Sequence, residues 1–260
     1  MKGLFAVLVL SFSALLAAAC APKGPGIALP EVPSEGLVRA LEQRRQAFPG
    51  LKAIARVQVV RKDRKRAFDT VGILLESQHR LRMEAYGPFG ESLLALAWDG
   101  SDMQLLLAGE TQPLRPGQFG LDRILGAGVQ PAELCAILSG NIPASPGEET
   151  VKAYCGREGL CAVEFRSGDV ARRAWLTGPA AGSDSVAAVS LYEVYRSGRL
   201  IYRARFEEPQ ILSHYVLPGK IIVENPDQRA SLSVEYTDLE LADQFPAGLF
   251  TLSGGEAPAP

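Results

Sequence analysis

The feature that most constrains this chain is the alternation of apolar and polar residues in short segments that are joined by tight turns. Residues 200–206 and 230–237 place apolar side chains at every second position. This is the pattern of a strand with one buried face and one face in water. Because the connections between such segments are short, we expect neighbouring strands to be antiparallel.

The remaining expected strands fall into two groups separated by helical segments. Helical spacing is expected over residues 34–48, around Leu121, Ile124 and Leu125, and from Pro131 to Ser139. These helices must bury their apolar stripes, and the concave side of the sheet is the available partner. The sequence therefore predicts one α+β domain, a strongly curved antiparallel sheet with a helical lid. The other expected strands are residues 51–60, 67–76, 79–86, 92–98, 103–108, 151–154, 162–165 and 172–176.

The N-terminus has the pattern of an export signal. Lys2 precedes an apolar stretch, residues 4–16, and three alanines lead into Cys20. The stretch is shorter than the roughly 20 apolar residues of a spanning helix, which favours a signal peptide. Two interpretations stay open, a bacterial lipoprotein signal with a lipid on Cys20 and an ordinary signal with a coincidental cysteine.

On the first interpretation the chain divides into four parts. The signal peptide is residues 1–19, a lipidated, flexible tether is 20–35, the folded domain is 36–245, and a flexible tail is 246–260. The chain would then be attached to a membrane by its lipid, because no other segment is long and apolar enough to span one.

Two cysteines flank a five-residue loop between expected strands. Cys155 and Cys161 would lie opposite each other in a hairpin, at a distance that a disulfide can bridge. Export favours the disulfide, and two reduced neighbours are the alternative. Cys135 lies in an apolar helical segment and is expected to be a buried thiol.

Residues suited to catalysis are scarce. The two histidines, His79 and His214, have no carboxylate or cysteine companions at ligand spacing, and the common catalytic, phosphate-binding and metal-binding motifs are absent. The adjacent pair Glu207 and Glu208 would point to opposite faces of a strand. We expect no metal, no cofactor and no enzymatic activity, although scattered carboxylates leave an enzyme as a minor alternative.

Charge argues against nucleic acid as a partner, since the net charge is -2 and the pI is about 5.8. The densest cluster is the basic run over residues 61–66. Its simplest interpretation is a solvated hairpin tip. A weak attraction to anionic lipid headgroups, worth about 1 kcal/mol per charge, is the alternative.

The segment 81–98 places an aromatic residue where a hairpin normally has polar turn formers. Two apolar strands are joined by residues 87–91, in which Gly87, Pro88 and Gly90 surround Phe89. Phe89 either projects as an exposed finger or folds back onto the core.

This segment resembles the outer-membrane lipoprotein receptor LolB and the broader LolA/LolB-like superfamily. The family pattern of a strand, a Gly-Pro-Leu-Gly type of turn and an apolar strand stands here as residues 86–93, with Phe89 in place of the usual leucine. The start at residues 20–26 is similar to the receptor's tether, and the order of elements agrees over residues 36–206. Beyond residue 206 the chain is longer than the receptor, closer to a diverged subgroup.

The resemblance implies an incomplete β-barrel whose helices cover a hydrophobic cavity. The cavity would receive acyl chains of lipoproteins from a periplasmic LolA-like carrier, at about 0.8 kcal/mol per buried CH₂. Phe89 would help to insert the cargo into the bacterial outer membrane from its periplasmic face, with the protein acting as a monomer. The candidate lining residues, whose alternative is ordinary core packing, are Val57, Val59, Ile73, Leu81, Met83, Leu94, Leu96, Trp98 and Leu105.

A second function stays open, because a fold does not fix an activity. The same fold can serve as a structural or assembly lipoprotein of the envelope that binds protein partners instead of lipid.

Overall fold

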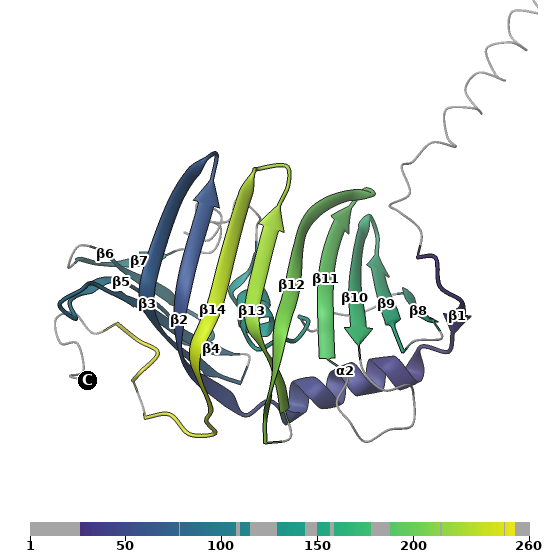
Figure 1. The fold of residues 1–260 in the computed structure, drawn as a ribbon, viewed down its shortest axis with the longest axis horizontal. Coiled ribbons are helices and arrows are strands. Elements are labelled where there is room, and N and C mark those ends of the chain that lie inside the picture. The colour runs from purple at the N-terminus through teal and green to yellow at the C-terminus, as the bar shows by residue number, and fades with distance from the viewer. Residues whose placement is uncertain are drawn as a thin grey trace, which may run out of the picture.

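The computed structural model describes residues 27–77, 79–107, 110–114, 129–143, 150–156, 159–177, 188–213, 215–246 and 248–252. Cys20, the expected helical segment around Leu121 to Leu125, and His214 lie outside the described residues. Within the described residues, fourteen strands form one sheet, and two helices lie against it (Figure 1).

The helices are α2 (Glu35–Ala47) and α4 (Pro131–Leu138), both close to their expected positions. The strands in chain order are β1 (Glu31–Val32), β2 (Gly50–Arg61), β3 (Arg64–Glu76), β4 (Arg80–Tyr86), β5 (Ser92–Trp98), β6 (Met103–Leu107), β7 (Glu110–Leu114), β8 (Thr150–Cys155), β9 (Cys161–Ser167), β10 (Val170–Thr177), β11 (Ala188–Arg196), β12 (Arg199–Leu212), β13 (Tyr215–Asn225) and β14 (Ala230–Leu241).

The sheet is antiparallel throughout and is open. Its order is β1-β8-β9-β10-β11-β12-β13-β14-β2-β3-β4-β5-β6-β7, so that the last strand, β14, lies beside β2. This pairing runs from Ala230 opposite Arg61 to Leu241 opposite Leu51. Among the described residues, no pairing joins the end strands β1 and β7. The predicted α+β class and antiparallel, incomplete barrel are therefore confirmed at the level of the sheet.

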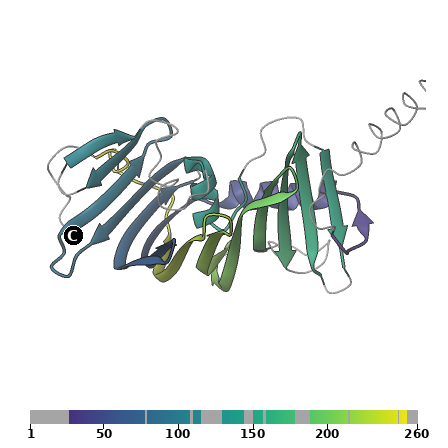
Figure 2. The same ribbon diagram turned by 90° about the horizontal axis from the view of Figure 1, so that it is seen from above.

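Alternation divides the sheet into two faces, which we call the inner and the outer face. The inner face carries the hydrophobic core, to which β2 contributes Leu51, Ala53, Ala55 and Val57. Leu134, Ile137 and Leu138 of α4 pack into the same core. Figure 2 shows both helices on this side, with α4 inside the curve of the sheet. α2 and α4 therefore pack against the concave side of the sheet, as predicted.

Two terminal segments contribute more to the fold than the sequence predicts. Part of the expected tether is strand β1, which pairs with β8 through Glu31 opposite Tyr154. Part of the expected flexible tail, residues 248–252, packs on the outer face of β4 to β6. Phe250 and Leu252 are only 3% and 8% exposed, and Leu252 contacts a small cluster with Ala95 and Ala97.

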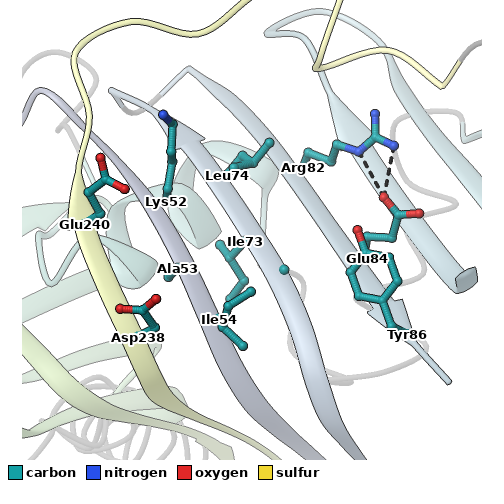
Figure 3. Close-up of a pocket in the computed structure, with 11 residues that line it drawn as sticks. Lys52, Ala53, Ile54, Ile73, Leu74, Arg82, Glu84, Tyr86, Asp238 and Glu240 are labelled. Atoms are coloured by element: carbon teal, nitrogen blue, oxygen red, sulfur yellow. Dashed lines mark hydrogen bonds and ion pairs between the residues drawn. The ribbon is translucent and has the colours of Figure 1, made fainter. Parts of the chain in front are cut away.

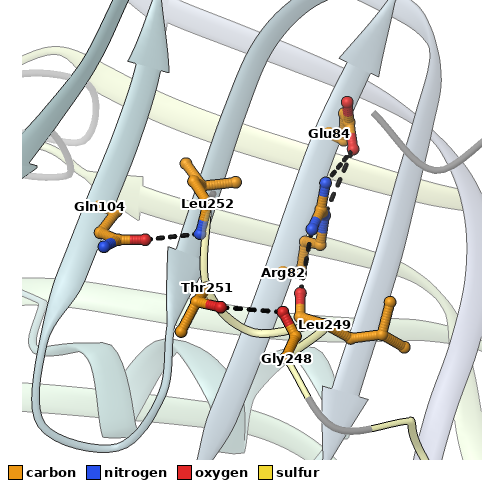
Figure 4. A network of polar contacts seen from close by, with 7 residues as sticks. All are labelled: Arg82, Glu84, Gln104, Gly248, Leu249, Thr251 and Leu252. Carbon is orange, nitrogen blue, oxygen red and sulfur yellow. Dashed lines mark hydrogen bonds and ion pairs between the residues drawn. The ribbon is translucent and has the colours of Figure 1, made fainter. Parts of the chain in front are cut away.

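Polar contacts hold this C-terminal segment in place (Figure 4). Arg82 donates a hydrogen bond from Nη1 to the carbonyl oxygen of Leu249 at 3.1 Å. The backbone N–H of Leu252 donates to Oε1 of Gln104 at 2.5 Å. The segment therefore crosses from β4 to β6 and links strands that are two places apart in the sheet.

Candidate functional site

The turn between β4 and β5 presents Phe89 to solvent. The side chain of Phe89 is 94% exposed, so it does not fold back onto the core. The backbone N–H of Gly87 donates to the carbonyl of Glu91 at 2.8 Å, and that of Gly90 donates to the carbonyl of Gly87 at 3.0 Å. Gly90 has a φ of 82°, a left-handed conformation that glycine adopts without strain.

Glu91 fixes the turn from inside. Its carboxylate oxygen Oε2 accepts a hydrogen bond from the backbone N–H of Phe89 at 3.0 Å. A Cβ atom at Gly87 would lie only 2.1 Å from the other carboxylate oxygen of Glu91, so a larger residue here would displace the Glu91 side chain from its present position. The tip is a closed, hydrogen-bonded turn that carries an unburied aromatic ring.

The strands behind this finger carry an apolar strip on their inner face. Met83, Leu96 and Leu105 are direct neighbours across β4, β5 and β6. All three are half-buried, as is Leu94 on β5. Side chains on one face of adjacent strands pack side by side, and here they form a continuous apolar surface that the core only partly covers.

A separate groove lies on the inner face at the other half of the sheet. This inner groove has a volume of about 230 Å³ and runs between α2, the segment that follows α4, and strands β9 to β11. Its lining is mostly apolar, with charged groups among it: Val38, Leu41, Glu42, Arg45, Ile142, Pro143, Phe165, Arg172 and Tyr192. A hydrogen bond from Arg45 lowers the pKa of the Glu42 carboxyl, so that this pair stays ionised beside the apolar wall.

The predicted cavity residues share the inner face but do not surround one described cavity. Four of them are buried and belong to the ordinary packing of the core: Val57, Ile73, Leu81 and Trp98. Met83, Leu94, Leu96 and Leu105 form the half-buried apolar strip, and Val59 is half-buried beside the core. None of the nine lines the inner groove. Its residues were missed because they come from α2, from the segment after α4, and from strands remote in sequence from the finger.

Comparison with known proteins adds evidence on the fold. No family model matches the sequence, and no curated protein matches it. Solved structures do match. A LolA superfamily protein from Nitrosomonas europaea superposes with a TM-score of 0.53 at 15% identity, over 85% of this chain and 98% of that one.

Two further structures agree with this match. A DUF1329 family protein from Desulfovibrio piger has a TM-score of 0.56 at 11% identity, over 83% of this chain and 95% of that one. A protein described as a putative outer membrane lipoprotein-sorting protein domain, from Vibrio parahaemolyticus, has a TM-score of 0.55 at 12% identity, over 83% and 94%.

The chain shares its fold with these proteins, one of which belongs to the LolA superfamily. At these identities the likeness concerns the fold alone, and it agrees with the open, curved antiparallel sheet that the resemblance of residues 86–93 implied.

In this LolA-like fold, a buried cation joins the two helices to the sheet. Arg44 of α2 is 2% exposed and donates from Nε and Nη2 to the carbonyl oxygen of Gly140, which follows α4, at 3.3 and 3.2 Å. Nη2 also donates to the carbonyl of Val216 on β13 at 2.6 Å. The guanidinium lies 4.5 Å from the ring centroid of Tyr215, at a distance typical of a cation–π contact.

Burial shifts both ionisable groups of this junction. It lowers the pKa of Arg44, while Tyr215 opposes that shift, and it raises the pKa of Tyr215 to about 12. Tyr215 is therefore a neutral hydrogen-bond donor, and its hydroxyl donates to Oδ1 of Asn141 at 2.9 Å. The junction has the contacts of a structural element that fixes the position of α2 relative to the end of α4.

The outer face of the LolA-like sheet has its own groove, of about 280 Å³, in which charged side chains stand beside the apolar residues Ile54, Ile73 and Leu74 (Figure 3). Lys52, Asp238 and Glu240 line one side. On the other side Nη2 of Arg82 donates to Oε2 of Glu84 at 3.0 Å. Ile73 is thus the one predicted cavity residue among those that line this groove, and the charged side chains around it would lose hydration if a hydrocarbon chain lay there.

The predicted disulfide is present, between Cys155 and Cys161 with a Cα–Cα distance of 4.1 Å. Cys135 is a buried free thiol. Within the described residues no group of three or more metal-ligating side chains occurs. No helix in the described part of the chain is long and apolar enough to cross a membrane.

Proposed function

We propose that this protein binds the acyl chains of lipoproteins on its inner face and inserts the lipoproteins into the bacterial outer membrane. It would be attached to the periplasmic face of that membrane by a lipid on Cys20 and would receive its cargo from a LolA-like carrier. The observation that carries the proposal is the finger. An aromatic side chain that is 94% exposed stands at the tip of two strands whose inner face is apolar and half-buried.

The energetics of this role require no catalyst. Each buried CH₂ contributes about 0.8 kcal/mol, so an acyl chain that leaves water for an apolar surface gains several kcal/mol. The inner groove, at about 230 Å³, is smaller than the roughly 300–1,000 Å³ of ligand sites. Binding a full acyl chain in that groove therefore requires α2, or the segment that follows α4, to move away from the sheet.

Two adjacent leucines of β5 provide a matched test. Leu94 faces inward and is half-buried, whereas Leu93 faces outward and is 43% exposed. In a displacement assay with a fluorescent fatty acid, we expect Leu94→Glu to lose probe binding and Leu93→Glu to retain it. Leu105→Gln, a milder change on the same strip, is expected to weaken binding if Leu94→Glu does not fold. Equal probe binding by the folded inward and outward variants would contradict the proposal.

One observation favours the alternative, an envelope lipoprotein that binds protein partners. Four of the predicted lining residues are already covered by the protein's own side chains in the core. Native mass spectrometry of the protein extracted from membranes distinguishes the two functions. A bound acyl species supports the lipid-binding role, whereas a lipid-free protein that also fails to bind the fatty-acid probe supports the alternative.

A further inference from the structure

Four hairpins that are neighbours in the sheet have their turns along one edge. The turns of β2–β3, β9–β10, β11–β12 and β13–β14 lie at the same end of neighbouring strands, along the top of Figure 1. We call their residues the basic edge: 61–66, 166–169, 196–199 and 226–229. Side chains at these positions are exposed, apart from the half-buried Arg61 and Gly198.

Hydrogen bonds and ion pairs join the four turns into one surface. Ser197 donates from its backbone N–H to the carbonyl of Asp169 at 2.7 Å. Arg199 forms an ion pair with Asp227 at 2.7 Å. The N–H of Lys62 donates to the carbonyl of Arg229 at 3.2 Å. Each contact links one hairpin to the next, so the turns keep their relative positions.

The basic edge is strongly positive in a chain that is slightly negative. It holds nine lysines and arginines and three aspartates, a net charge of +6, whereas the whole chain has -2. The rest of the chain therefore carries -8. Two of the aspartates have partners within the edge. Asp169 accepts a hydrogen bond from the Ser197 hydroxyl at 3.0 Å, and Asp227 forms its ion pair with Arg199.

The fold keeps like charges together at this edge. Arg196 lies directly opposite Arg199, and Arg61 lies opposite Arg64. Like charges at directly opposed positions destabilise a sheet. Positive charge concentrated this way is favourable when an anionic partner lies against the edge.

We propose that the basic edge docks on the phosphate groups of anionic phospholipids. The inference rests on the proposed lipid anchor, because only six residues lie between Cys20 and Ile27, where the described fold begins. An extended tether of that length reaches about 24 Å at most. The folded domain is then held beside the bilayer surface, where each basic residue near anionic lipid contributes about fivefold in affinity.

Vesicle flotation tests this docking without the anchor. The assay uses residues 20–260 with Cys20→Ala and vesicles of phosphatidylcholine with or without phosphatidylglycerol. We expect binding to the anionic vesicles only, and release at about 1 M salt, where the Debye length is about 3 Å. The double variant Lys62→Gln, Lys65→Gln is expected to bind about 30-fold more weakly.

A second pair of substitutions removes the same charge elsewhere. Arg39 on α2 and Lys152 on β8 are exposed and lie outside the basic edge. Arg39→Gln, Lys152→Gln is expected to change binding less than twofold. Three outcomes would each overturn the inference. The protein binds neutral vesicles as tightly as anionic ones, the Lys62→Gln, Lys65→Gln variant binds anionic vesicles as tightly as the unsubstituted protein, or the protein binds an oligonucleotide more tightly than anionic vesicles.

The docking and the acyl-binding role can fail separately. Leu94→Glu, designed to abolish acyl binding, is expected to bind anionic vesicles like the unsubstituted protein. Loss of docking in Lys62→Gln, Lys65→Gln with normal fatty-acid binding supports a dedicated docking surface. If the unsubstituted protein binds the fatty acid but does not bind anionic vesicles, the docking proposal is overturned and the proposed function is unaffected.

Discussion

At the scale of single residues, the finger depends on local chemistry that is visible in the sequence. Gly90 adopts the left-handed conformation of the tight turn, and Glu91 accepts a hydrogen bond from the N–H of Phe89. The sequence therefore indicates the hairpin. It leaves open the direction of the aromatic ring, because exposure depends on whether another segment of the fold covers the tip. In the structure, Phe89 is left 94% exposed.

Phe89→Glu is expected to leave the free energy of unfolding within about 0.5 kcal/mol of the original, since the ring makes little buried contact. Under the proposed function, it is also expected to abolish transfer of lipoproteins into outer-membrane vesicles. Phe89→Leu, which keeps an apolar side chain, is the control and is expected to retain transfer. If Phe89→Glu transfers lipoproteins at the normal rate, Phe89 has no role in transfer.

The cysteines allow a chemical test of the described structure. Burial raises the pKa of the Cys135 thiol well above its ordinary value, which suppresses the reactive thiolate. With Cys20→Ala, iodoacetamide is expected to leave the native protein unlabelled and to add one label after unfolding without reductant. Three labels after unfolding without reductant would mean that Cys155 and Cys161 are not joined, against the disulfide seen here.

At the scale of elements, β12 and β14 follow from alternation, whereas four strands lie outside those that the sequence predicts, namely β1, β7, β11 and β13. β13 contains Pro218 and Gly219, a pair that indicates a turn. Pro218 nonetheless lies opposite Pro209 within the β12–β13 pairing. β1 is only two residues long, too short for a periodic pattern to be recognised, and β7 contains Pro113, which weakens the strand signal of its sequence. Such strands exist because the neighbouring strand supplies hydrogen bonds.

The C-terminal segment 248–252 is the element whose role differs most from its sequence pattern. Phe250 is 3% exposed, lies 5.5 Å from Phe245 between ring centroids, and is covered by Arg80. An isolated pentapeptide with a threonine, a glycine and three apolar residues gives no periodic signal. Its position depends on Arg82 and Gln104, which the fold places beneath it.

Phe250→Ala is expected to reduce the free energy of unfolding by about 3 kcal/mol, since it empties a buried aromatic site. Ile211→Ala is the matched control, because Ile211 is large and apolar but 77% exposed, and its effect is expected to stay below about 0.5 kcal/mol. Urea unfolding measures both values. An effect of Phe250→Ala no larger than that of Ile211→Ala would show that the segment does not stabilise the sheet.

At the scale of the whole molecule, Arg44 connects parts of the chain that are far apart in sequence. Its bonds to Gly140 and Val216 span 96 and 172 residues. An arginine in a helix otherwise indicates a solvated face, and its burial here follows from the position of α2 against α4 and β13. The carbonyl of Gly140 follows the C-terminal end of α4, which carries the negative end of the helix dipole.

Arg44→Ala is expected to cost about 3 kcal/mol of unfolding free energy, because it leaves the carbonyls of Gly140 and Val216 buried without their donor. Arg39→Ala, on an exposed position of the same helix, is the control and is expected to change stability by less than about 0.5 kcal/mol. Thermal unfolding followed by circular dichroism measures both. Equal stability of the two variants would mean that the buried junction contributes nothing.

The local and periodic features of this protein can be read from its amino-acid sequence. Alternation defined the half-buried strands, helical spacing defined α2 and α4, and loop length paired Cys155 with Cys161. The tertiary structure alone decided the features that depend on non-local packing. These are the pairing of β14 with β2, the burial of Arg44, the contact of residues 248–252 with the outer face, and the alignment of four basic turns. The physical reason is that burial and charge density are set by which segments become neighbours, and a one-dimensional pattern contains only the neighbours along the chain.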